Sequence, residues 1–225
     1  MNEDNDERFQ SSYSTRTWRG CCVVPVVSIV AILVLALAAG LFDRPTNRPD
    51  SPGTAQTSKN RLQFIEFGQT FFAIAQTADK INEQAFEELD KFTRQQRSAR
   101  SLKSAFARAS MANRRAAEKY KNLDVPSALS AQKKCREAVD KIAESFTARR
   151  NACEAVIQWA DDPNDKQIAQ RYARHAQDVT TLTQAGLTAF ADAAKRNGVT
   201  DQDAHEFLPQ ALQQSMSQFG MLGER

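Results

Sequence analysis

Glycine and proline are scarce across most of this 225-residue chain, and their positions limit what it can fold into. Between residues 53 and 198 only four occur: Gly68, Pro126, Pro163 and Gly186. Tight turns between strands need such residues, whereas long helices avoid them. The sequence therefore predicts an all-α domain of long helices separated by a few breaks.

Two apolar seams predict a helical hairpin over residues 127–196. A residue before proline avoids the helical conformation, so Pro126 indicates a helix over 127–160. Asp162 as N-cap, Pro163 after it and Gly198 as left-handed C-cap indicate a second helix over 163–196. Seams of this spacing pack as antiparallel neighbours. The seam residues are Cys135, Val139, Ile142, Phe146, Arg149, Cys153, Val156 and Ala160, then Ile168, Tyr172, His175, Val179, Leu182, Gly186, Ala189 and Ala193.

Two more apolar stripes precede this hairpin and are in register with each other. A single helix of about 65 residues and 97 Å would be possible at 1.5 Å per residue. A break at residues 93–98 is favoured instead, because this stretch lacks apolar residues and Ser98 can cap a helix. The break produces four helices of similar length, as an up-down-up-down bundle requires.

The tail from 201 to 219 has a narrow apolar stripe with Pro209 inside it, so it is expected to be kinked or split. Thr200 and Asp203 form a capping-box-like start. We expect the tail to pack across one end of the bundle, with docking onto a partner or a membrane as the alternative.

Residues 23–42 form an uncharged run, long enough to cross ~30 Å of hydrocarbon as a helix. We interpret residues 21–42 as a transmembrane signal anchor that binds the lipid bilayer. A buried core helix and a cleaved signal peptide are the alternatives, the latter because Ala36 and Ala38 have a small-x-small spacing. A polar lead of twenty residues, 1–20, argues against cleavage.

The lysine and arginine counts on the two sides of this span tie, so they do not decide its orientation. Arg16, Arg19 and Trp18 favour the N-terminus inside and an extracytoplasmic C-terminal domain. Cys21 and Cys22 stand where the membrane begins, either as sites of reversible acylation or as small membrane-tolerant residues.

The rest of the chain divides into a linker and a domain. Residues 43–60 hold three prolines and one glycine, with no periodic apolar pattern, which predicts a flexible linker. Residues 61–225 form the helical-bundle domain. The predicted fold is an all-α, antiparallel up-down-up-down four-helix bundle with a short C-terminal helix, preceded by one transmembrane helix.

Catalytic, metal and cofactor chemistry finds little support in the sequence. Neither His175 nor His205 has a glutamate three positions before it, so the pairs of di-iron bundles are missing. Cys135 and Cys153 stand about 27 Å apart on one helix and are expected to be buried thiols, with intermolecular bridging as the alternative. No nucleophile elbow, phosphate loop or zinc pattern occurs. We expect no catalytic residues, no bound metal and no cofactor.

Three ionisable residues interrupt the apolar seams: Glu88, Arg149 and His175. If the hairpin turns near residue 162, Arg149 lies opposite His175. The hypothesis is a polar layer in which Glu88 accepts hydrogen bonds from both and sets helix register. The alternative is that Arg149 points outward and the three never meet.

Residues 91–121 have ten basic residues and one acid, a local charge of +9, although the whole chain carries only +3. Their helical positions place most of these charges opposite the apolar stripe, as a face that could meet anionic lipid or an acidic partner. The alternative is a solvated face balanced by Glu83, Glu87 and Asp90. No segment is basic enough to predict nucleic-acid binding.

These features predict a non-catalytic, membrane-tethered helical bundle with a binding or scaffolding role. An extracytoplasmic sensor or small-ligand-binding module is the alternative. It would need an internal cavity, which we would expect near Gly186, where the seam lacks a side chain. The oligomeric state stays open.

Overall fold

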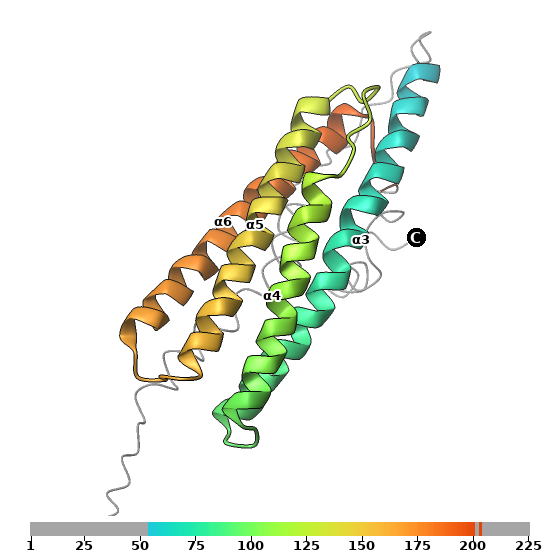
Figure 1. Ribbon diagram of the computed structural model, residues 1–225. Coiled ribbons are helices and arrows are strands. Elements are labelled where there is room, and N and C mark those ends of the chain that lie inside the picture. The colour runs from blue at the N-terminus through green and yellow to red at the C-terminus, as the bar shows by residue number, and fades with distance from the viewer. Residues whose placement is uncertain (1–53, 201–202, 204–225) are drawn as a thin grey trace, which may run out of the picture.

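A computed structural model describes residues 54–200 and residue 203 of the chain. In this part the regular secondary structure is all helical, and consecutive helices run in opposite directions (Figure 1). Each helix packs against the next along the chain. The prediction of an all-α fold with four packed helices is confirmed. The helices are α3 (Thr54–Thr93), α4 (Ala99–Lys121), α5 (Gln132–Trp159) and α6 (Lys166–Arg196).

The predicted membrane anchor lies outside the described residues, as do the polar N-terminal tail and all but one residue of the predicted C-terminal helix. Of the helices that the structure does describe, none combines the length and the apolar character needed to span a bilayer.

The first helix begins earlier than the sequence indicates. Residues 54–60 were expected to belong to the linker, but they form the start of α3. Asn60 is buried there, and its side-chain amide donates a 2.8 Å hydrogen bond to Ser130 Oγ. This contact with the α4–α5 connection holds a polar segment in the helix that its composition alone does not predict.

The predicted break between the first two helices is confirmed. Ser98 is the N-cap of α4, and its hydroxyl accepts a hydrogen bond from the Ser101 amide at 3.3 Å. The end of α3 is closed by Gln95, whose φ of 60° is left-handed, and by a 2.9 Å bond from the Gln96 amide to the Lys91 carbonyl. These bonds form a Schellman-type end, so the continuous 65-residue helix does not form.

The start of α6 differs from the prediction. Its N-cap is Asp165, not Asp162, and the Asp165 carboxylate accepts from the amides of Gln167 and Ile168 at 2.7 and 3.3 Å. The indole of Trp159 donates to the Pro163 carbonyl at 3.0 Å. If Pro163 were the first residue of the helix, its carbonyl would accept a hydrogen bond within the helix. Here the carbonyl accepts from Trp159 instead, and the helix begins three residues later, at Lys166.

The start of α5 is also later than predicted, at Gln132 rather than 127. Residues 127–131 form turns, and Leu129 and Ala131 from this segment are buried in the core. Continuing the helix backwards would withdraw these side chains from their apolar contacts, so packing overrides the local helix signal.

The end of α6 follows the prediction. Gly198 has a φ of 74°, and the Val199 amide bonds the Ala194 carbonyl at 3.1 Å, as in a Schellman motif. The predicted capping-box-like contact between Thr200 and Asp203 is present. The Asp203 carboxylate accepts hydrogen bonds from the amide and the hydroxyl of Thr200, both at 2.8 Å. Arg61 of α3 also pairs with Asp203, which ties the start of the bundle to its end.

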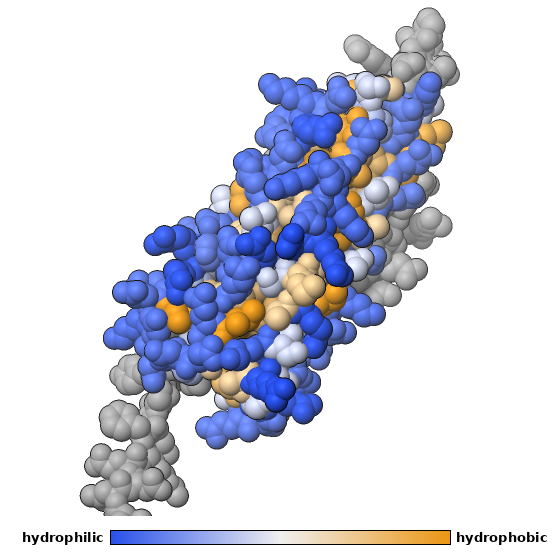
Figure 2. All heavy atoms as spheres, viewed as in Figure 1, coloured by the Kyte–Doolittle hydropathy of each residue, from blue (hydrophilic) through white to orange (hydrophobic). Residues whose placement is uncertain are grey.

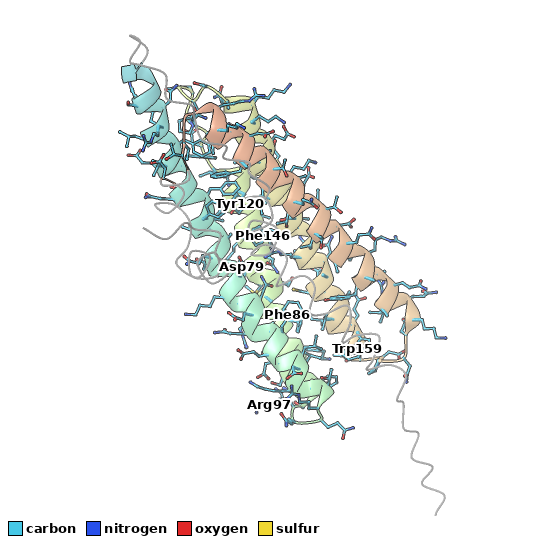
Figure 3. The ribbon with its side chains drawn as sticks, turned by 180° about the vertical axis from the view of Figure 1, so that it is seen from behind. Asp79, Phe86, Arg97, Tyr120, Phe146 and Trp159 are labelled. Atoms are coloured by element: carbon cyan, nitrogen blue, oxygen red, sulfur yellow. The ribbon has the colours of Figure 1, made fainter. Side chains whose placement is uncertain are left out.

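The core has two apolar clusters, one at each end of the bundle. In Figure 3, Tyr120 and Phe146 lie on one side of Asp79 along the bundle, and Phe86 and Trp159 lie on the other. The first cluster is rich in aromatic rings, and Phe190 of α6 contacts four phenylalanines of α3 with centroid distances of 4.8–6.1 Å. The four are Phe64, Phe67, Phe71 and Phe72.

Candidate functional site

The α4 helix has the strongest charge imbalance among the described elements. It contains seven basic residues and one glutamate, for a net charge of +6. Six of the seven basic side chains are exposed and Lys103 is half-buried, while the apolar residues of α4 are buried. Hydrophilic residues dominate the surface that Figure 2 shows, with smaller apolar areas between them. The prediction that the basic side chains point away from the core is confirmed.

Five of the ten predicted basic residues form ion pairs with carboxylates. Glu88 takes two of them, and the others each have their own partner. The pairs, with their N–O distances, are Lys91–Glu88 at 3.1 Å, Arg97–Glu88 at 3.7 Å, Arg94–Asp90 at 2.8 Å, Lys103–Asp161 at 2.7 Å and Arg114–Glu118 at 2.9 Å. Of the three acids expected to balance the face, Asp90 alone does so within the described part.

The other five form no ion pair with any described residue. Arg108 donates a 3.2 Å hydrogen bond to Ser104 Oγ, which carries no charge. All five are exposed on α4. They are Arg100, Arg108, Arg115, Lys119 and Lys121. We call these five the unpaired basic set. Within the described part no carboxylate neutralises their positive charge, so it can attract an anionic group.

The predicted layer of Glu88, Arg149 and His175 does not form. Glu88 accepts from Ser101 Oγ at 2.8 Å and from Lys91, and these hydrogen bonds lower the pKa of its carboxyl group. His175 lies 3.8 Å from Asp178 on its own helix. Glu88 therefore belongs to the α3–α4 turn, away from the other two residues.

Arg149 is buried on its seam as predicted, but its partner is Asp79. The Arg149 guanidinium donates to an Asp79 carboxylate oxygen at 2.5 Å and stands 4.7 Å from the centroid of the Phe146 ring. Asp79 lies nine positions before Glu88, about 13 Å along α3. The assumed turn near residue 162 agrees with the end of α5 at Trp159 and the start of α6 at Lys166. It did not determine how α3 aligns with these two helices.

A second buried polar contact lies beside this ion pair. Asn82 and Asn113 exchange two amide hydrogen bonds at 2.8 and 2.9 Å, and Asn113 also donates to Cys153 Sγ at 3.5 Å. Together with Arg149 and Asp79 these groups form a polar layer between the two apolar clusters. Asn82 and Asp79 have no distinguishing sequence signal. Asn113 does, because it is the polar member of the apolar stripe that includes Leu102, Phe106 and Ala109.

Both cysteines of the described part are free and buried, as predicted. Burial raises the pKa of the Cys135 thiol to about 11 and that of the Cys153 thiol to about 12. Thiols with such values are almost fully protonated at neutral pH, and the thiolate is the reactive form. These two side chains therefore act as small apolar groups within the packing.

The cavity considered near Gly186 is not there, because a neighbouring side chain fills the space. A Cβ built on Gly186 would lie 2.8 Å from both Cγ1 and Cδ1 of Ile142, and 3.3 Å from the Ala138 carbonyl oxygen. The glycine thus allows α5 and α6 to approach closely. The structural requirement of the small-ligand sensor is not met at this position.

The remaining chemistry of the described residues is sparse. They bring together no group of three or more histidine, cysteine, aspartate or glutamate side chains that could hold a metal ion. What the α4 surface can do is form ion pairs and hydrogen bonds with an anionic partner.

No protein-family model matches the chain, and neither a curated protein nor a solved structure matches it. A fold alone does not specify a function, and four helices packed in this way serve many. The charges and contacts of the surface are therefore what indicates the function.

Proposed function

We propose that this chain is a membrane-tethered helical bundle with a non-catalytic binding or scaffolding role, and that the basic face of α4 is its binding surface. The observation that carries the proposal is the unpaired basic set, five exposed cations on one helix that no described carboxylate neutralises. Charge concentrated in this way attracts anionic partners and speeds their association.

The complete architecture belongs to the same proposal. Residues 21–42 would anchor the chain in the bilayer, residues 43–53 would form the tether, and the C-terminal tail would pack across one end of an up-down-up-down four-helix bundle. The tether holds the bundle near the membrane, so its partner is a lipid headgroup or a protein at that surface. The N-terminus is proposed inside and the bundle in the extracytoplasmic space.

A charge-matched pair of variants tests the binding surface. The full chain in nanodiscs of neutral phosphatidylcholine is titrated with poly-L-glutamate and with vesicles containing phosphatidylserine. The first variant is Arg100→Gln/Arg108→Gln/Arg115→Gln, and the control is Arg94→Gln/Lys103→Gln/Arg114→Gln, which removes three paired cations. We expect the first to lose more affinity and more salt dependence, because its charges have no internal partner.

Equal losses in both triple variants would show that only the net charge matters. An unaltered affinity in the first variant, or a wild-type chain that binds neither probe at low salt, would overturn the proposal that α4 is the binding surface.

The proposed topology has its own test. A tag at the C-terminus is exposed to protease in intact cells. Cleavage from outside is expected, and protection that is lost only on lysis would place the bundle in the cytosol instead.

A further inference from the structure

Met111 is an exposed apolar side chain in the middle of the basic face. It is 56% exposed, and Leu62, at 61%, is the other large hydrophobic side chain that the described part leaves exposed. Arg108, Arg114 and Arg115 stand three or four positions from it, so they share its face of the helix. The surface thus has an apolar centre with arginines around it, which is the arrangement of residues that protein interfaces favour.

Carboxylates border this basic face on both sides. On the α3 side, Glu88 accepts from Ser101 Oγ at 2.8 Å. On the α5 side, Glu154 accepts from Ser110 Oγ at 3.4 Å, and Asp161 follows beyond α5. These carboxylates already have basic partners, so the unpaired positive charge is confined to the strip of α4 that lies between them. A partner about as wide as one helix, roughly 10 Å, can contact α4 without covering its borders.

From this arrangement we infer that α4 docks an acidic amphipathic helix of another protein, with an apolar residue of that helix packed on Met111 and its carboxylates on Arg108 and Arg115. The inference rests on the proposed function and names the chemical class of its partner. The partner helix needs one apolar stripe with glutamates or aspartates on both flanks.

The ion pairs of the arginines and the apolar contact of Met111 would contribute differently to the binding affinity. Exposed ion pairs add little affinity, but they steer the partner and fix its orientation. Met111 supplies the apolar area, and its flexible thioether adapts to the shape of the partner. Removing the methionine should therefore lower affinity at every salt concentration, whereas removing arginines should mainly reduce the salt dependence.

The test uses the full chain in phosphatidylcholine nanodiscs and a labelled synthetic helical peptide with a leucine stripe and flanking glutamates. Met111→Gln is expected to weaken peptide binding on the order of tenfold, the value of one buried apolar side chain. Leu62→Gln is the matched control and should bind as the wild type does. Far-ultraviolet circular dichroism verifies that both variants fold.

A second peptide, with its leucines replaced by glutamine, separates the apolar contribution from charge. Weaker binding of this peptide, with no further loss on Met111→Gln, supports the inference. If Met111→Gln left binding of the leucine peptide unchanged, the apolar centre would have no role and the inference would be wrong, although a purely electrostatic surface would remain.

Vesicles containing phosphatidylserine distinguish the membrane from the peptide. Strong binding of wild-type chain to these vesicles without binding of the leucine peptide would overturn the inference and leave α4 as a lipid-binding face. Absence of binding to both probes at low salt would overturn the proposed function as well.

Discussion

Asn82 of α3 and Asn113 of α4 exchange two side-chain amide hydrogen bonds in the interior of the bundle. Each amide nitrogen has a second acceptor: the Ala78 carbonyl at 2.9 Å for Asn82 and the Cys153 sulfur at 3.5 Å for Asn113. The pair therefore connects three helices at one level. A shift of register would separate the two amides and bury them without partners, so the pair specifies how α3, α4 and α5 align.

Asn113→Leu should destabilise the fold by about 1–3 kcal/mol, because it leaves the buried Asn82 amide without its main partner. Adding Asn82→Leu should recover part of the loss, since both polar groups are then gone. Urea unfolding of the full chain in mild detergent measures both effects. Thr183→Val is the control: the buried Thr183 hydroxyl has no hydrogen-bond partner among the described residues, so the change breaks no hydrogen bond and should not destabilise the fold. A single Asn113→Leu variant as stable as the wild type would contradict the register role.

Asp79→Ala should cost more stability than Arg149→Met. Arg149 is 9% exposed, whereas the side chain of Asp79 is 40% exposed. Removing the aspartate leaves a buried cation unpaired, but removing the arginine leaves a carboxylate that water can solvate. We expect losses of about 2–3 kcal/mol for Asp79→Ala and about 1 kcal/mol for Arg149→Met. Thermal unfolding compares the two, and the reverse order would argue that the contact with Phe146, not the ion pair, holds Arg149.

Gly186→Ala should destabilise the α5–α6 interface by about 1 kcal/mol net. Alanine favours the helix by about as much, but its Cβ would meet the Ile142 side chain at 2.8 Å and force it to move. In an Ile142→Ala background the same substitution should cost much less, because the clash with the Ile142 side chain is gone and only the 3.3 Å approach to the Ala138 carbonyl oxygen remains. A double-mutant cycle measures the coupling. Additive effects would mean that Ile142 can move without cost.

Maleimide labelling of Cys135 and Cys153 should be slow in the folded chain and fast in guanidinium chloride. Both thiols are buried, and burial keeps them protonated near neutral pH. Cys21→Ser/Cys22→Ser removes the other two thiols, so mass spectrometry reports the buried pair alone. Rapid labelling of folded protein would indicate that the bundle opens locally.

Stability should fall above about pH 9, near the ordinary pKa of a thiol. Cys135 and Cys153 have folded pKa values of about 11 and 12, and burial also raises the pKa of Tyr120. Because the folded state holds the neutral forms, their contribution is complete below the unfolded pKa values and is lost as the pH rises through the folded ones. Melting temperature against pH tests this, and the slope should be shallower in a Cys135→Ala/Cys153→Ala variant.

The helix-forming segments, the break before Ser98 and the end of α6 at Gly198 could be predicted because they depend on local signals. Caps, prolines and seam spacing act within a few residues of chain. The burial of Arg149 was also predictable, because the residue lies on the apolar seam of its helix, and that seam faces the neighbouring helices. The starts of α5 and α6 were not, because they depend on where two side chains lie. Leu129 is buried in the core, and the Trp159 indole bonds the Pro163 carbonyl, so both helices begin later than their local signals indicate.

The sequence by itself determined that the described part is all α, where its helices break, and that the charges of α4 lie opposite its apolar stripe. Only the tertiary structure decided which polar groups meet: Asp79 with Arg149, and Asn82 with Asn113. It also decided that Ile142 fills the space at Gly186. The physical reason is register. A periodic seam is compatible with several alignments one turn apart, and the sum of packing and buried hydrogen bonds across all four helices selects one of them.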